Sequence, residues 1–173
     1  MFCPSEWRSL AAKVVVENPE QYPDSFLGKT SSDYADWIQR DSTWGGEIEL
    51  SIYSEHLAAE IAVVDIETNN VYIYGNGRGF SKRYYVLYDG IHYDALVLGT
   101  GDDELRDLTE FRPDEEDIKT QFQDLAKQLR RQRQFTNVAT FSLQCLVCGQ
   151  GLVGQEEAVD HAQRTGHQNF GQF

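Results

Sequence analysis

Apolar residues recur at helical spacing near the amino terminus. Between residues 4 and 18 they return every three or four positions, which predicts an amphipathic helix. Ser5 is the expected cap of this helix, and Pro19 ends it. Two shorter helices are predicted downstream, one over residues 31–38 and one that begins after residue 46. The apolar face of the first helix comprises Trp7, Leu10, Ala11, Val14 and Val15.

The pattern then changes from helical to extended. Three segments are short, rich in β-branched and aromatic residues and bounded by turn residues, so they predict sheet strands: residues 61–66, 71–74 and 84–88. Another extended piece is expected near residues 93–98. The glycine-rich stretch 75–79 looks like a phosphate-binding loop, but no helix follows it. A hairpin turn is therefore the better interpretation of this stretch.

An acidic stretch, residues 102–117, predicts a loop that leads into a long helix. Asp114, Glu115 and Glu116 favour the start of that helix, because negative side chains stabilise the positive end of the helix dipole. The apolar face of this helix comprises Ile118, Phe122, Leu125 and Leu129. The mixture of helices and short strands predicts an α/β fold.

Composition places the chain among globular proteins. Its 173 residues are 40% hydrophobic, which is enough for one main core. We expect a larger domain over residues 1–135 and a small unit over residues 136–173. No run of apolar residues is long enough to predict a membrane span. No signal peptide is recognisable, so we expect a reducing, cytoplasmic location.

Two cysteines and two histidines close to the carboxy terminus have the spacing of a zinc finger. Cys145, Cys148, His161 and His167 form the pattern C-x2-C-x12-H-x5-H. A turn would aim both thiolates at one point, and histidines on a following helix would complete a tetrahedron around Zn²⁺. Four protein ligands close the site, so the predicted zinc is structural and the unit is a small ββα finger. Phe141 and Leu152 are its expected apolar contacts.

Charge argues against a nucleic-acid partner for this finger. The chain has a formal net charge of −13, and the predicted finger helix carries Glu156, Glu157 and Asp160. A surface of this sign repels phosphate, whose neutralisation supplies most non-specific affinity for DNA. A nucleic-acid-binding finger protein is therefore the disfavoured third hypothesis, and a basic protein partner suits the charge better.

One local pattern suggests catalytic chemistry. After the strand over residues 84–88, an Asp-Gly turn presents His92, and Asp94 follows two positions later on the same side of an extended chain. Such a carboxylate orients an imidazole and stabilises its charged form, as in nucleophilic triads. The alternative is a turn histidine with an acid nearby. Local sequence alone leaves both interpretations open.

Motifs spread along nearly the whole chain resemble the ovarian-tumour (OTU) class of cysteine deubiquitinases. The narrower resemblance is to the branch that has a terminal Cys₂His₂ finger and works with the valosin-containing AAA ATPase. The motifs are Leu27-Gly28-Lys29-Thr30, Tyr34 with Asp36-Trp37-Ile38, Asp41 with Thr43-Trp44-Gly45-Gly46 and Glu49, Val63-Val64-Asp65, Tyr88-Asp89-Gly90-Ile91-His92-Tyr93-Asp94, residues 131–135, and Thr165-Gly166-His167 with Asn169-Phe170-Gly171.

The resemblance implies a fold, an activity and partners. It implies an OTU-type cysteine-protease-like α/β domain that hydrolyses isopeptide bonds in ubiquitin chains during endoplasmic-reticulum-associated degradation and the unfolded protein response. It makes His92 the general base and Asp94 its orienting acid. It also assigns Tyr88, Asp89, Gly90 and Ile91 to the substrate-binding loop that positions His92.

The sequence departs from this family at the nucleophile. The family's catalytic cysteine stands in an Asp-x-x-Cys loop, and no such motif occurs in these 173 residues. Cys3 matches an ordinary position of the family, and the amino-terminal module that docks the ATPase is absent too. We therefore expect a truncated product, a late-start isoform or a partial gene model that is inactive alone. The rival hypothesis is a non-catalytic adaptor that binds ubiquitin.

Overall fold

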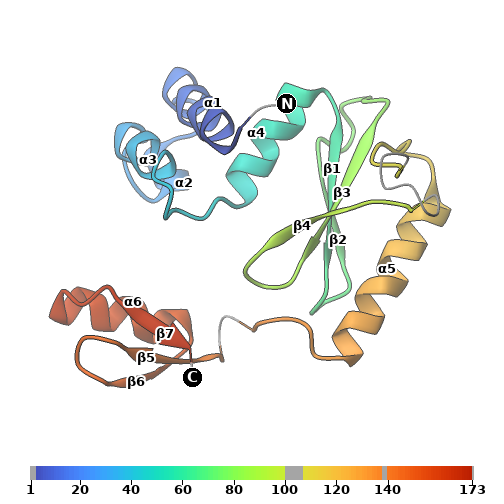
Figure 1. Cartoon of the computed structure of the whole chain (residues 1–173). Helices are drawn as coiled ribbons and strands as arrows, with labels where there is room; N and C mark the ends of the chain where they lie inside the picture. Colours follow the sequence, from blue (N-terminus) through green and yellow to red (C-terminus); the bar gives the residue numbers. More distant parts are fainter. Residues whose placement is uncertain (1–2, 100–106, 138–139, 173) are drawn as a thin grey trace. The chain divides into compact units, whose positions relative to one another are not determined.

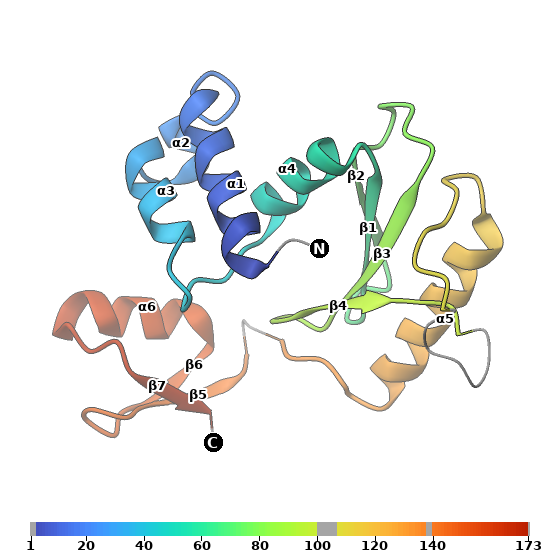
Figure 2. The same cartoon turned by 45° about the horizontal axis from the view of Figure 1, so that its top comes forward.

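The computed structural model describes residues 3–99, 107–137 and 140–172 (Figures 1 and 2). The chain divides into two compact units, Met1–Ile61 with Ile73–Arg83 and Ala62–Tyr72 with Tyr84–Phe173. Part of the predicted acidic loop, residues 102–106, lies outside the described residues. The predicted domain boundary between residues 135 and 136 stays a prediction. Across the described ranges, no helix has the length and apolar character needed to span a membrane.

Four helices make up most of the first unit: α1 (Pro4–Glu17), α2 (Asp24–Leu27), α3 (Ser31–Ile38) and α4 (Glu47–Leu57). The sequence predicted three of them and missed the single turn of α2. Ser5 is not the cap of α1, because Pro4 already occupies the first helical position and Cys3 precedes it as the N-cap. The Glu6 carboxylate satisfies the main-chain N–H of Cys3 at 2.6 Å instead.

Hydrogen bonds of polar side chains connect these helices around an apolar core. The Arg8 guanidinium donates to the carbonyls of Ile38 (2.8 Å) and Thr43 (2.7 Å), which joins α1 to the end of α3. The Tyr34 hydroxyl donates to the buried Glu49 carboxylate at 2.5 Å. Burial and this acidic partner raise the pKa of Tyr34, so the hydroxyl stays a donor. The core comprises Ala11, Ala12, Val15, Tyr22, Leu27, Tyr34, Ala35, Ile38 and Ile52.

A four-stranded sheet follows, formed by β1 (Glu60–Asp65), β2 (Val71–Tyr74), β3 (Arg83–Tyr88) and β4 (Tyr93–Leu96). The strand order is β2-β1-β3-β4. Because β1 lies between β2 and β3, the glycine-rich stretch 75–79 is a crossover turn, and its prediction as a hairpin turn was wrong. The turn passes close to α4: a Cβ on Gly75, at φ +77°, would lie 2.2 Å from Ser54 Oγ.

An aromatic cluster packs α5 (Glu116–Arg131) on the sheet. The Phe122 ring of α5 lies 4.9 Å from the ring of Tyr85, a buried residue of β3. Phe111 lies 5.6 Å from both of these rings. Such tilted and edge-on contacts suit the ring quadrupoles. The predicted apolar face of the long helix is therefore the face that meets the sheet at Phe122.

The carboxy-terminal part of the second unit is a finger with three strands. It consists of β5 (Ser142–Cys145), β6 (Gly151–Val153), α6 (Gly154–Thr165) and β7 (Phe170–Gln172). The strand order is β6-β5-β7, so β7 adds an edge that the predicted ββα unit lacked. Leu143, Leu152 and Ala158 form its core, with Phe141 and Phe170 packed against them. The predicted contacts of Phe141 and Leu152 are confirmed.

The ion pair between Glu60 and Arg83 joins the start of β1 to the start of β3, and substitutions in it test how much this buried pair contributes to stability. Both side chains are almost fully buried, with Arg83 Nη2 and Glu60 Oε2 2.6 Å apart. Arg83→Met should cost about 3–5 kcal/mol, because it leaves a buried carboxylate unpaired. Urea unfolding measures this loss, and Glu60→Met with Arg83→Met should recover part of it. Arg78→Met, which breaks an exposed pair with Glu55, should change stability much less.

Candidate functional site

The β3–β4 connection places the predicted base and its acid side by side. Tyr88 pairs with Tyr93 at the end of the two strands, so residues 89–92 form a four-residue turn. His92 stands at the end of this turn, and Asp94 lies in β4. The Nδ1 atom of His92 is 3.2 Å from Oδ1 of Asp94. The side chains are 55% and 65% exposed, so other groups have access to the imidazole.

The Asp89 carboxylate holds this turn from inside. Its Oδ1 accepts the main-chain N–H groups of Ile91 at 2.8 Å and His92 at 2.7 Å. In addition, the Asp89 N–H donates to the His92 carbonyl at 3.2 Å. An aspartate whose side chain accepts hydrogen bonds from the main-chain N–H groups two and three residues later forms an Asx-type turn. The Asp-Gly pair in the sequence signals this turn, although the sequence analysis gave Asp89 only a substrate-binding role.

Two tyrosines flank the turn. The Tyr88 hydroxyl donates to the Gly90 carbonyl at 2.6 Å, and its ring stacks on Tyr93 with 4.6 Å between the ring centres. Burial and the nearby Asp65 and Asp89 carboxylates raise the pKa of Tyr88, so the hydroxyl keeps its proton. Tyr88 and Gly90 therefore fix the turn's main chain.

The four predicted zinc ligands converge on one point. Cys145 ends β5, Cys148 lies in the turn after it, and His161 belongs to α6. His167 follows the left-handed Gly166 that ends α6. The ligand atoms of all four residues lie within 4.8 Å of one another.

The distances fit a tetrahedral zinc. Cys145 Sγ is 3.6 Å from His167 Nδ1, and Cys148 Sγ is 3.6 Å from His161 Nε2. Ligands at about 2.3 Å (sulfur) and about 2.0 Å (nitrogen) on a tetrahedron are also about 3.6 Å apart. His161 is nearly inaccessible to solvent, and the Phe170 ring of β7 lies 6.0 Å from it. This contact depends on β7, a strand that the spacing of apolar residues did not predict.

The surroundings of the Cys145 thiol favour its thiolate form. It is buried, and burial alone would raise its pKa, but hydrogen bonds from the main-chain N–H groups of Cys148 and Val147 outweigh that effect and lower the pKa. A lowered pKa favours the thiolate, which is the form that binds zinc. With four protein ligands the site leaves no position open for a reacting water, so this zinc is structural.

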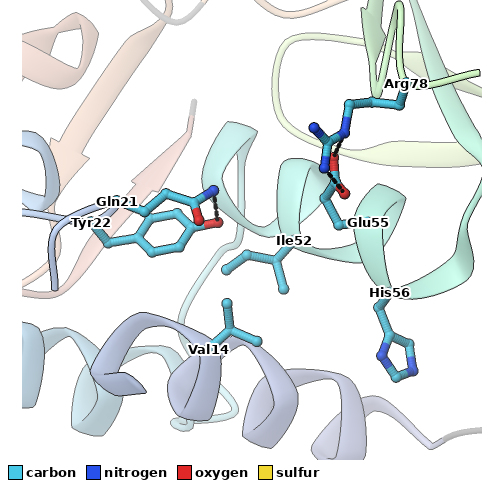
Figure 3. Close-up of a pocket in the computed structure, with 7 residues that line it drawn as sticks. All are labelled: Val14, Gln21, Tyr22, Ile52, Glu55, His56 and Arg78. Atoms are coloured by element: carbon cyan, nitrogen blue, oxygen red, sulfur yellow. Dashed lines mark hydrogen bonds and ion pairs between the residues drawn. The ribbon is translucent and has the colours of Figure 1, made fainter. Parts of the chain in front are cut away.

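A separate hollow of about 570 Å³ lies in the helical unit (Figure 3). The Arg78 guanidinium and the Glu55 carboxylate pair across part of it, 2.8 Å apart, and so neutralise each other. His56 lines it as well, and its ring meets Trp7 edge-on with 5.9 Å between ring centres. We assign no chemistry to this hollow. Its lining comprises Val14, Gln21, Tyr22, Ile52, Glu55, His56 and Arg78.

Residues 139–173 match the family model described as "Ubiquitin thioesterase OTU1, C-terminal C2H2-type zinc finger". Over 170 residues the chain is 46% identical to ubiquitin thioesterase OTU1 of Homo sapiens, which covers 98% of this chain and 49% of that protein. It is also 41% identical, over 174 residues, to the Arabidopsis thaliana "OVARIAN TUMOR DOMAIN-containing deubiquitinating enzyme 2", which covers 97% of this chain and 84% of that protein.

A solved structure agrees with these sequence matches. It is titled "Structure of Ovarian Tumor (OTU) domain in complex with Ubiquitin" and superimposes with a TM-score of 0.71 at 31% identity. The match covers 79% of this chain and 77% of that one. The chain spans about half the length of the animal relatives that it matches.

The metal site leads to a direct prediction. The purified chain should hold about one zinc, because the four ligands form a single closed site. Chelation should melt the finger, whose assembly depends on the metal, and leave the rest of the chain folded. Metal analysis and circular dichroism measure both effects. Cys145→Ser should abolish zinc binding and Cys3→Ser should preserve it; a zinc content near zero in the unaltered chain would contradict the assignment.

Proposed function

This chain belongs to the ovarian-tumour (OTU) family, and we propose that it supplies the histidine base, the orienting acid and the zinc finger of a cysteine deubiquitinase. The observation that carries the proposal is the pair formed by His92 and Asp94, 3.2 Å apart on an exposed turn. The proposed reaction is hydrolysis of the isopeptide bond that follows the carboxy-terminal glycine of ubiquitin. The human relative is named a ubiquitin thioesterase, and the Arabidopsis relative is named a deubiquitinating enzyme.

In the proposed mechanism Asp94 sets the tautomer of His92. The carboxylate accepts a hydrogen bond from Nδ1–H, which leaves Nε2 free to take a proton from a thiol. The resulting thiolate attacks the carbonyl carbon of the isopeptide bond, and the imidazolium returns the proton to the leaving amine. Water then hydrolyses the thioester that has formed, which releases the ubiquitin carboxylate and restores the thiol. Asp94 stabilises the imidazolium while it exists. The thiol must come from the Asp-x-x-Cys loop of the family, a motif that these 173 residues do not contain.

Charge supports ubiquitin as the substrate. The chain has a net charge of −13, and the carboxy-terminal tail of ubiquitin carries arginines. Complementary charge speeds the encounter of two proteins and helps to orient them. The turn over residues 89–92 is exposed enough to meet such a tail, with Ile91 offering an apolar contact.

The narrower setting of this activity is also part of the proposal. We place the protein in endoplasmic-reticulum-associated degradation and the unfolded protein response, in the cytoplasm, together with the valosin-containing AAA ATPase. Support for this setting comes from the family branch with a terminal finger, to which residues 139–173 are similar. The finger would then act beside a ubiquitin-processing domain.

A second candidate is a non-catalytic adaptor that binds ubiquitin. These 173 residues contain no Asp-x-x-Cys motif, so on their own they offer His92 no such thiol, whereas an upstream segment with that motif would favour the enzyme. Turnover separates the two candidates, whereas ubiquitin binding is common to both.

The 173-residue chain alone should bind ubiquitin weakly and leave ubiquitin chains intact. Binding should weaken as salt is raised, because screening shortens the reach of the acidic surface. Amide shifts of labelled ubiquitin measure the binding, and a ubiquitin probe with a thiol-reactive carboxy terminus tests for a nucleophile. Labelling of Cys3 together with chain cleavage would contradict the absence of a catalytic thiol. No shift at high protein excess would remove both candidates.

An extended form should recover turnover when the Asp-x-x-Cys segment of a full-length relative is joined upstream. In that form His92→Ala should lower kcat by at least about 100-fold, the usual contribution of a general base. Asp94→Ala should lower it less, because an orienting acid improves only the geometry and tautomer of the base. Asp124→Ala, an exposed acid on α5, is the matched control and should keep full activity. Equal activity of all three variants would contradict the proposed roles.

A further inference from the structure

The histidine turn touches the segment that joins α5 to the finger. The main-chain N–H of Thr136 donates to the Asp89 carbonyl at 2.7 Å. The Thr136 carbonyl oxygen faces Gly90 so closely that a Cβ there would lie only 1.9 Å away. Gly90 also has a φ of +102°, which strains any residue with a side chain. The turn and residues 135–137 therefore meet main chain to main chain (Figures 1 and 2).

This joining segment is itself anchored on both sides of Thr136. Before it, the Gln134 N–H donates to the Leu129 carbonyl at 3.0 Å, which ties the segment to the end of α5. After it, the Asn137 amide donates to the Glu67 carboxylate at 2.5 Å. The helix α5 is in turn held on the sheet by Phe122. A continuous set of contacts thus runs from the aromatic core to the histidine turn.

Hydrogen bonds support this exposed turn at several points. Ile91 and His92 are exposed, and none of residues 89–92 is buried. The contacts that fix the turn include the hydrogen bonds of Asp89, of the Tyr88 hydroxyl and of the Thr136 main chain. Because the turn lies at the surface, the loss of one of these bonds should make local opening easier.

We propose that residues 135–137 form a clamp that holds the histidine turn, with Gly90 and the main chain of Thr136 as positioning elements for His92. The catalytic part of this inference rests on the proposed function, whereas the clamp itself does not. The clamp gives the segment that joins α5 to the finger a role that needs neither zinc nor any contact made by the finger. The clamp acts through Thr136 main-chain atoms, so the Thr136 side chain is dispensable for it.

The test uses two substitutions at one position of the 173-residue chain. Thr136→Pro removes the N–H that binds the Asp89 carbonyl, whereas Thr136→Ala keeps it. We expect Thr136→Pro to shift the ring resonances of His92 and to speed hydrogen exchange of the His92 amide by up to about tenfold, the effect of losing one hydrogen bond. Thr136→Ala should leave both unchanged. Equal effects of the two substitutions would overturn the main-chain role.

A second pair of variants keeps the test decisive if Thr136→Pro disturbs folding. Gly90→Ala should push the turn away from Thr136 and move the His92 resonances. Gly77→Ala is its matched control, because Gly77 has a φ of +77° but nothing within 4 Å of an added Cβ. Unmoved His92 resonances in Gly90→Ala would overturn the clamp.

Activity then separates this inference from the proposed function. In the extended, active form, Thr136→Pro should lower kcat by a larger factor than it raises KM, because it misplaces the base as well as the turn that meets the ubiquitin tail. If the extended form is inactive even without substitutions, the proposed function fails, while the resonance and exchange results still decide the clamp. If Thr136→Pro moves the resonances but not kcat, the clamp exists and its positioning role is overturned.

Discussion

The hydrogen bonds that the Asp89 carboxylate makes to its own turn are the interaction on which the candidate site depends. The side chain of His92 is more than half exposed, so packing alone does not fix its direction. Its position comes instead from the main chain that carries it, and Asp89 binds that main chain at Ile91 and His92. Once the main chain of the turn is fixed, the alternation of side chains along β4 places Asp94 on the same side as the imidazole. The rest of the sheet and α5 serve to hold this short connection in place.

The finger obtains its stability from a different source. Among the described residues, its core cluster comprises three buried apolar side chains, Leu143, Leu152 and Ala158, which is too little for a unit of this size to fold unaided. A bound zinc compensates for the missing core, because metal binding and folding are coupled in such units. The added strand β7 brings Phe170 against His161 and so covers one of the ligands. The metal centre and the small core are thus one structure.

Sequence reasoning succeeded where the determining interactions are local. Helical spacing predicted α1, α3 and α5, and cysteine and histidine spacing predicted the four residues that converge in the finger. It failed where distant residues decide. The stretch 75–79 has the composition of a hairpin turn, but the position of β1 between β2 and β3 makes it a crossover. The strand β7 is three residues long and forms only because β5 offers an edge.

The histidine site shows the same division. The Asp-Gly turn and the spacing of His92 and Asp94 are readable in the sequence, because the strand period places them on one side. The approach of Thr136 to Gly90 is not readable, since more than forty residues separate them along the chain. Nothing in the composition of residues 134–137 marks them as neighbours of the histidine turn. Contacts of this kind depend on where the end of α5 lies in space, and Phe122 is one contact that holds α5 on the sheet.

If Asp94 orients His92 as we propose, the neutral imidazole carries its proton on Nδ1, facing Asp94, and its Nε2 is free. Nitrogen-detected NMR of the 173-residue chain reports which ring nitrogen carries the proton. We expect the proton on Nδ1 in the unaltered chain and the loss of this preference in Asp94→Ala. A ring protonated mainly on Nε2 in the unaltered chain, as in free histidine, would show that Asp94 does not set the tautomer of His92.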